Sequence, residues 1–506
     1  MLMANNYNME MRKTSVSIRK GASMGQVADW ESAARDTSDA FWRSWLADEG
    51  VNSFEAIHEW VVERNTHTPV DIKRVSLDEC DPWRYDETSG RITNPSGSFF
   101  QIAGLRKVER NLESGEGRVV AEQPVLLQDE IGYLGIICRE FDGVMHFLMQ
   151  AKIEPGNVNK VQISPTIQAT RSNFLQLHGG RRPAYLDYFL HSGEYEIIVD
   201  QIQSEQSSRF FGKRNRNVVV LVEDDVDTLS THMWMTLGQI KRLMRYDNLV
   251  NMDTRTVLSC LPWSQWPAPS EAVAREVSAR DAPLYASLRK ESALAGLTRA
   301  YHELNDYKMF DTSKTELIPL RDLSDWEMRP DEVRHRESYP FRVIFCDIAI
   351  EGREVKRWNQ PLFDARGKAT FGLLACERDG ALEFLVKVHP EVGCFDRAEL
   401  APTLQREAGS LDVMDDVEQG FVRLLEQGEG VVRDVLLSEE GGRFFCEQNR
   451  NVIIRLDRCP EGLEGDRLPK GYLWLDYASL CLLLRANNAL NIQLRNLLSL
   501  LDFPRD

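Results

Sequence analysis

Short apolar runs separated by polar turns dominate the hydrophobic pattern of this chain. The stretches 134–138, 146–153 and 216–222 are rich in β-branched and aromatic residues and are bounded by Gly, Asp or Asn. This pattern predicts strands, and the Asp142-Gly143 dipeptide predicts a hairpin between the first two. We therefore expect a sheet that is at least partly antiparallel.

Other segments have the spacing of helices. Thr236 and Gln239 stand at capping-box distance just before apolar residues spaced for one helix face. A further helix is expected over about 253–261. Upstream, Ser53 precedes an apolar face and is a suitable N-cap. That face consists of Phe54, Ile57, Trp60 and Val61.

The chain also repeats itself. Residues 123–168 align without a gap with residues 360–405, at a constant separation of 237 positions. A second block, 207–223, matches 441–457 at a separation of 234, and a third continues at 240. A fixed period of this kind marks duplicated structural units. In the third block Asp476, a good N-cap, stands where the first copy has Thr236.

The duplication sets the expected domain organisation. At 506 residues the chain is too long for one hydrophobic core. We expect a loose arm over 1–25, one repeat over 26–265 and a second over 266–506, with a Pro- and Ala-rich seam at 266–272. Each repeat should be α+β, with a mixed sheet flanked by helices.

Composition and charge narrow the function classes. Hydrophobic residues make up 42% and charged residues 27%, which is typical of a folded, soluble protein. The formal net charge of −17 disfavours binding to nucleic acids or membranes. The nine cysteines contain no C-x-x-C pair, and we find no leader peptide or long apolar segment. We expect a cytoplasmic location.

Several long phrases resemble one family. They are QAKIEPGN (150–157), QISPTIQAT (162–170), HGG (178–180), RNRN (214–217) and the segment 234–263. These phrases are similar to the NDP-hexose 2,3-dehydratases of deoxysugar biosynthesis, and the resemblance covers roughly residues 30–503. It implies two tandem Nudix-like domains, each with a cleft for a dTDP-sugar, and assembly as a homodimer. The Nudix box is absent from both copies, so neither a bound metal nor pyrophosphate hydrolysis is expected.

The resemblance also implies a reaction. The chain would eliminate water across C2–C3 of a dTDP-4-keto-6-deoxyhexose. The product, dTDP-3,4-diketo-2,6-dideoxyhexose, would pass to a separate 3-ketoreductase on the way to a 2,6-dideoxysugar of a secondary metabolite such as an antibiotic. No cofactor is expected, because water leaves and the electrons only rearrange. Two alternatives remain: a non-catalytic nucleotide-sugar-binding protein, and a degenerate Nudix-type hydrolase.

The elimination requires a base, an acid and donors to an enolate oxygen. The candidate catalytic residues are Lys152, His178 and Tyr185. His178 has a suitable unperturbed pKa and is followed by two glycines that permit close approach of a substrate. We place catalysis in the first repeat, because the family phrases are intact there, although His389 in the second repeat is an alternative base.

The candidate binding residues come from these phrases, from Asp81-Pro82-Trp83-Arg84 and the block 207–223, and from matching positions of the second repeat. A cationic loop suits a diphosphate, Pro in a β-like run frees backbone groups for a ligand, and Trp can stack on thymine. Each group also has a structural reading, as a solvent-facing strand, a kink, a hairpin tip, a helix cap or a core aromatic. The first-repeat set is Trp83, Gln150, Ser164, Pro165, Thr166, Ile167, Gln168, Asn173, Arg209, Arg214, Asn215, Asn248, Asn251 and Arg255. The second-repeat set is Trp326, Lys387, His389, Pro402, Thr403, Gln405, Arg443 and Asn449.

Overall fold

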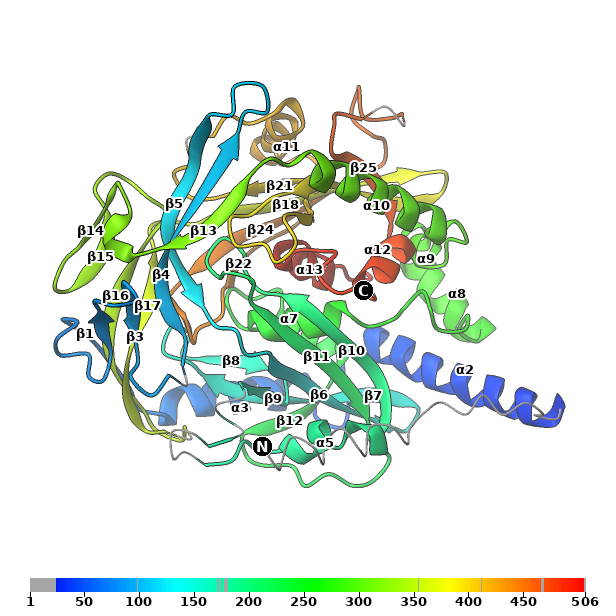
Figure 1. Ribbon diagram of the computed structural model, residues 1–506. Coiled ribbons are helices and arrows are strands. Elements are labelled where there is room, and N and C mark those ends of the chain that lie inside the picture. The colour runs from blue at the N-terminus through cyan, green and yellow to red at the C-terminus, as the bar shows by residue number, and fades with distance from the viewer. Residues whose placement is uncertain are drawn as a thin grey trace.

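The computed structural model describes residues 24–97, 99–170, 173, 175–176, 181–353, 355–410, 412–465 and 468–504. The arm expected over 1–25 lies outside these residues except for its last two. Those two residues begin helix α2 (Met24–Leu46), whose C-terminal half is buried against residues of both repeats. Figure 1 shows the remaining described elements as sheets with helices between and around them.

The first repeat is built around one mixed sheet. Its strands are β6 (Gly132–Phe141), β7 (Val144–Ile153), β8 (Val161–Ser164), β9 (Ile167–Ala169), β10 (Glu196–Ser204), β11 (Arg214–Leu221) and β12 (His232–Thr236). The main path runs β10-β11-β6-β7-β12, in which β11 is parallel to β6 and the other neighbours are antiparallel. The hairpin predicted at Asp142-Gly143 joins β6 to β7, and both turn residues have positive φ.

The second repeat forms the same sheet. Its strands are β18 (Thr370–Arg378), β19 (Ala381–His389), β20 (Glu399–Pro402), β21 (Leu404–Arg406), β22 (Val431–Ser438), β24 (Gln448–Leu456) and β25 (Tyr472–Asp476). Strand β24 is parallel to β18, as β11 is to β6, and the remaining pairs are antiparallel. The duplication read from the sequence is therefore present in the topology, and the α+β class is confirmed.

N-cap side chains mark the first turn of most of the helices. Thr236 and Gln239 form a complete capping box at α6 (Leu237–Leu243), and Asp476 caps α12 (Tyr477–Leu484). Ser53 caps α3 (Phe54–His67), whose predicted apolar face is buried. Helix α7 (Met252–Ser259) starts one residue earlier than expected because Asn251 is its cap. It packs against its counterpart α13 (Ile492–Ser499) between the two repeats.

Further helices surround this framework. They are α5 (Leu186–Leu190), α8 (Glu271–Arg280), α9 (Ala282–Leu288), α10 (Ala293–Phe310) and α11 (Asp416–Gln427). No helix in the described ranges is long and apolar enough to span a membrane.

The two repeats exchange strands. Strand β1 (Val70–Val75) of the first repeat pairs with β16 (Phe341–Ile350) of the second. In return, β13 (Lys314–Ile318) of the second repeat pairs with β4 (Gln101–Arg110) of the first. These pairs extend two more sheets, one holding β2 (Arg84–Asp86), β3 (Arg91–Thr93) and β5 (Gly117–Leu127). The other holds β14 (Trp326–Met328), β15 (Glu332–His335), β17 (Arg357–Ala365) and β23 (Phe444–Phe445).

A loop is exchanged as well. The amide of Gly156 donates to the carbonyl of Gly441, and a Cβ at Gly156 would lie 1.6 Å from the carbonyl oxygen of Phe444. In the mirror-image contact, a Cβ at Gly393 would lie 1.9 Å from the carbonyl oxygen of Phe210. Only glycine permits such approaches. One loop of each repeat therefore packs against the turn that follows a hairpin of the other repeat, which is β6–β7 in the first repeat and β18–β19 in the second.

Candidate functional site

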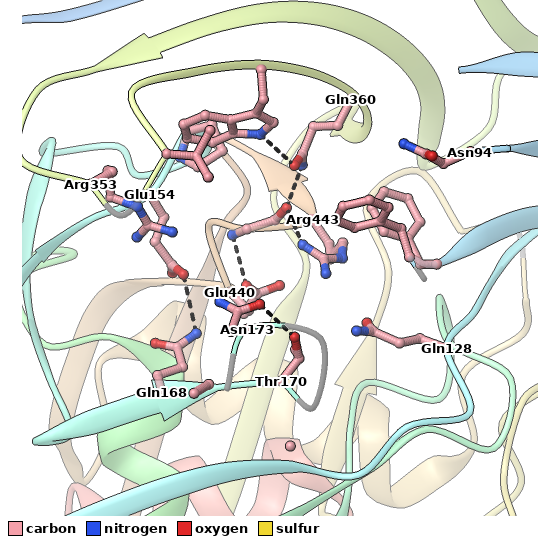
Figure 2. Close-up of a pocket in the computed structure, with 18 of the residues that line it drawn as sticks. Asn94, Gln128, Glu154, Gln168, Thr170, Asn173, Arg353, Gln360, Glu440 and Arg443 are labelled. Atoms are coloured by element: carbon pink, nitrogen blue, oxygen red, sulfur yellow. Dashed lines mark hydrogen bonds between the residues drawn. The ribbon is translucent and has the colours of Figure 1, made fainter. Parts of the chain in front are cut away.

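The exchanged loop of the second repeat closes a large pocket in the first. The pocket has a volume of about 950 Å³. Its walls come from β7, β9 and α7 of the first repeat and from β17 and the loop 440–443 of the second. Figure 2 shows Arg443 in the middle of this space, between Glu154 and Gln168 on one side and Asn94 and Gln128 on the other. The site therefore needs both repeats.

A lysine and a glutamate pair at one end of the pocket. Lys152, on β7, lies with its Nζ 3.2 Å from an oxygen of Glu154 just beyond the strand. Both side chains are at most 10% exposed. Gln168 of β9 donates to the same carboxylate at 3.2 Å, so Glu154 is oriented from two sides. This arrangement places a carboxylate and an ammonium group together in a sheltered position.

Three further carboxyl groups line the same end. Glu205 accepts a hydrogen bond from Asn215 at 2.5 Å, and Glu440 accepts one from the amide of Gly442 at 2.8 Å. Burial raises the pKa of Glu440 to about 7, and Glu154 and Glu205 add to the shift. Burial also raises the pKa of Asp253 well above its ordinary value. Carboxyl groups that retain protons near neutral pH are therefore available beside Lys152.

Two cations occupy the middle of the pocket. Arg443 lies 4.4 Å over the ring of Phe100 and donates to the carbonyl of Gly442 at 2.9 Å. Lys213 donates to the carbonyl of Glu130, and burial lowers its pKa to about 8. Neither cation forms an ion pair with a carboxylate in the described part of the chain. Their charges can therefore act on an anionic ligand.

Aromatic and amide side chains form another part of the pocket wall. Trp83 is buried and donates from its indole to the carbonyl of Asn359 at 2.8 Å. Trp358 is half-buried and donates to Gln360 at 2.9 Å, while Gln360 donates to the carbonyl of Gly442 at 2.6 Å. These groups offer flat apolar faces beside fixed polar atoms, which suits a planar ring.

Six of the sequence candidates line this pocket. They are Trp83, Lys152, Gln168, Asn173, Asn215 and Arg443. His178 lies outside the described residues, so its proposed role stays a prediction.

The phrase around Pro165 supports the site from behind. Pro165 lies between β8, which pairs with β7, and β9, which pairs with β6. Ser164 and Thr166 are buried: Ser164 hydrogen-bonds Gln168 at 3.2 Å, and Thr166 bonds to the backbone of β6 and β7. Ile167 is in the apolar core. The Pro therefore marks a corner that aims Gln168 into the pocket.

Several other candidates have structural contacts. Asn251 caps α7 and donates to Ser164, while Arg255 is buried and donates to the carbonyls of Val250 and Ser438. Asn248, at a positive φ, donates to Gln448. Burial raises the pKa of Tyr185, whose hydroxyl bonds the backbone of residues 227 and 229 away from the pocket lining.

Three remaining first-repeat candidates lie outside the lining set. Gln150 is on β7 opposite Ser164. Arg214 lies 3.8 Å over the ring of Phe395. Arg209 is the counterpart of Arg443.

In the second repeat, the position that corresponds to Arg443 is occupied by Arg209, which comes from the first repeat and has different contacts. Arg209 lies 4.3 Å over the ring of Phe341, matching the placement of Arg443 over Phe100. Unlike Arg443, it is buried and pairs with Glu407 at 3.0 Å and with Glu447 at 3.8 Å. Its charge is therefore already compensated within the protein.

The other second-repeat candidates are held in similar contacts. Lys387 pairs with Glu418 at 2.5 Å, Thr403 bonds to the backbone of β18 and β19, and Gln405 donates to Glu391 at 2.8 Å. Burial lowers the pKa of His389 to about 3, with help from nearby Lys387. Three more are buried without lining the first pocket: Trp326, Pro402 and Asn449.

Sequence reasoning missed Lys213, Asp253 and Glu440. All three line the pocket, yet none has a motif around it that signals chemistry. A usable signal existed in the alignment of the two copies, where their counterparts are Glu447, Gln493 and Gln206. Among the described side chains, no group of three or more His, Cys, Asp or Glu is arranged to hold a metal ion.

The fold and this site define a duplicated α+β protein with an acid-rich, cation-containing pocket shared between its repeats. The family model described as NDP-hexose 2,3-dehydratase matches residues 54–261 and 298–501. The chain therefore belongs to the NDP-hexose 2,3-dehydratase family.

Three relatives carry one name, dTDP-4-dehydro-6-deoxy-alpha-D-glucopyranose 2,3-dehydratase. That of Saccharopolyspora spinosa is 37% identical, over 87% of this chain and 90% of its own. Those of Amycolatopsis orientalis and Streptomyces violaceoruber are each 34% identical, over 92% and 89% of this chain and 94% and 97% of their own. A solved ADP compounds hydrolase aligns with 28% of this chain and 74% of its own, at 19% identity. Its TM-score of 0.18 carries no argument.

Proposed function

We propose that this chain removes water across C2–C3 of dTDP-4-keto-6-deoxyglucose and releases dTDP-3,4-diketo-2,6-dideoxyglucose. The names of the three relatives support the substrate and the reaction. The observation that carries the proposal is the meeting, in one pocket, of the Lys152–Glu154 pair and of Arg443, which forms no ion pair with a carboxylate of the described residues. An elimination on a nucleotide-linked sugar needs both an acid–base site and a diphosphate site.

Different lining residues of the pocket suit different parts of the substrate. Arg443 and Lys213 suit the diphosphate, because two unpaired cations face at least two negative charges there. Trp358 and Trp83, with the amides beside them, suit the thymine ring. The hexose would then lie against Lys152 and the buried carboxyl groups.

The chemistry follows from the ketone at C4. It acidifies the proton at C3, which a base removes to give an enolate. In this arrangement Glu154 is the base, because it lies in the sheltered end of the pocket beside the Lys152 ammonium group. Lys152, as the ammonium partner, donates to the enolate oxygen rather than removing a proton. The hydroxyl at C2 then leaves. No hydride is transferred, so the reaction needs no redox cofactor.

The direct test uses purified protein with dTDP-4-keto-6-deoxyglucose, a 3-ketoreductase and NADPH. We expect a 2-deoxy sugar nucleotide by mass spectrometry, and none when Glu154→Gln replaces the wild type. A wild-type protein that binds the sugar nucleotide without forming this product would be a binding protein instead.

We propose that residues 26–265 and 266–506 are Nudix-like units, that the chain forms a homodimer, and that it acts in the cytoplasm. A 3-ketoreductase would consume the unstable diketo product during the biosynthesis of a secondary metabolite. The family resemblance supports the fold, the dimer and the ketoreductase, and the sequence pattern supports the location.

A further inference from the structure

The duplication provides a comparison within the molecule between groups that recur and groups that do not. The Glu154–Gln168 hydrogen bond recurs as Glu391–Gln405, at 3.2 and 2.8 Å. The Asn215–Glu205 bond likewise recurs between Asn449 and Glu439, at 2.5 and 2.7 Å. Both repeats share these pairs, so the pairs do not distinguish the first pocket from the matching region of the second repeat.

Two of the four carboxyl groups described beside Lys152 have no acidic counterpart. Asp253 is the second residue of α7, and Gln493 is the second residue of the matching helix α13. Glu440 corresponds in the same way to Gln206. Because neutral amides serve the fold at the matching positions, folding alone does not require carboxyl groups here. Their presence in the first-repeat pocket, and not at the matching positions, indicates a chemical role.

Asp253 is the more isolated of the two. Its side chain is 1% exposed and lines the pocket. Neither carboxyl oxygen has a hydrogen-bond partner among the described residues, although buried polar atoms are normally paired. Burial raises its pKa, and the nearby Glu205, Glu440 and Glu154 raise it further. A buried, unpartnered carboxyl among other carboxyls holds a proton that it can give to a ligand.

We propose that Asp253 donates this proton to the C2 hydroxyl as the C2–O bond breaks, which rests on the function proposed above. Removal of the C3 proton by Glu154 leaves an electron pair in the C3–C4 enolate. That pair becomes the C2–C3 double bond, the C4 carbonyl re-forms, and the hydroxyl departs with the proton of Asp253 as water. When the resulting enol becomes a ketone, C2 gains a proton and the C3 hydroxyl loses one, which restores both residues.

The experiment separates the two proton transfers. Wild type, Asp253→Asn and Glu154→Gln are each incubated with dTDP-4-keto-6-deoxyglucose in D₂O. Deuterium at C3 of recovered substrate reports the base, and 2-deoxy product, captured by the ketoreductase, reports the elimination. For D253N we expect deuterium exchange to persist while product formation falls ~10²–10⁴-fold. For E154Q we expect both signals to be lost.

Matched controls keep the result interpretable. Gln493→Asn alters the corresponding helix position of the other repeat and should leave both signals at the wild-type level. Binding of dTDP-glucose by each variant shows that the pocket is formed. Unchanged product formation by D253N, or loss of exchange together with product, would overturn the role of Asp253. Absence of product from wild type would instead refute the proposed function itself.

Discussion

Replacing Gly156 with alanine tests the loop exchange on which the pocket depends. The added methyl group would lie 1.6 Å from the carbonyl oxygen of Phe444. The backbone sets the positions of both groups, so no side-chain rotation can relieve this contact. The loop of the second repeat must move away. Two backbone hydrogen bonds stretch as it does, from Gly156 to Gly441 at 2.7 Å and from Cys446 to Gly156 at 2.9 Å.

The magnitude follows from these contacts. Each lost hydrogen bond costs about 0.5–1.5 kcal/mol, and forcing extra volume into a packed region costs about 1–3 kcal/mol. The sum is about 2–6 kcal/mol. For 506 residues that unfold together, an unfolding entropy of about 2 cal/mol/K per residue converts this to a fall in Tm of about 2–6 °C. Because Arg443 lies on the displaced loop, kcat/KM should fall ~10²-fold as well.

Differential scanning calorimetry and steady-state assays measure the two effects. Gly193→Ala is the matched control, since a Cβ there meets nothing within 4 Å. Gly393→Ala, at 1.9 Å from Phe210, should lower Tm as much as G156A does. A G156A protein with the Tm and kcat/KM of G193A would refute the exchanged-loop packing.

Three more outcomes are expected. Arg443→Met should raise the Kd for dTDP-glucose ~10–100-fold with little change in Tm, because a charge-assisted contact is lost. Arg209→Met should instead lower Tm, because buried Glu447 and half-buried Glu407 lose their ion-pair partner. Equal effects of both variants on binding would contradict this expectation. Calorimetric titration with dTDP-glucose should give one site per chain, because Arg209 is already ion-paired. A result of two sites would contradict this and would agree with one cleft in each repeat, as the duplication predicts. Burial raises the pKa of Glu391 from 4.5 to about 8, so the folded state binds its proton more tightly than the unfolded state does, and this stabilisation is lost as pH rises through about 8. The fall in Tm between pH 6 and pH 9 should therefore be smaller in Glu391→Gln, and identical slopes would count against the assignment.

The sequence alone predicts structural features that depend on residues close together in the chain. The hairpin at Asp142-Gly143 and the capping box of Thr236 and Gln239 each depend on residues within four positions, so a local motif specifies them. Internal alignment likewise revealed the duplication, and long family phrases indicated the chemistry. For the site, the sequence indicated six of the lining residues, including Lys152 and Arg443.

Only the tertiary structure decided which charges face the ligand. Arg209 and Arg443 stand in nearly the same local sequence, yet Glu407 and Glu447 compensate the first and no described carboxylate pairs with the second. The pairing strands, the exchanged loops and the buried carboxyls that surround each guanidinium come from positions up to hundreds of residues away. Local sequence does not encode such contacts, because burial and charge compensation are set by whatever the fold brings alongside.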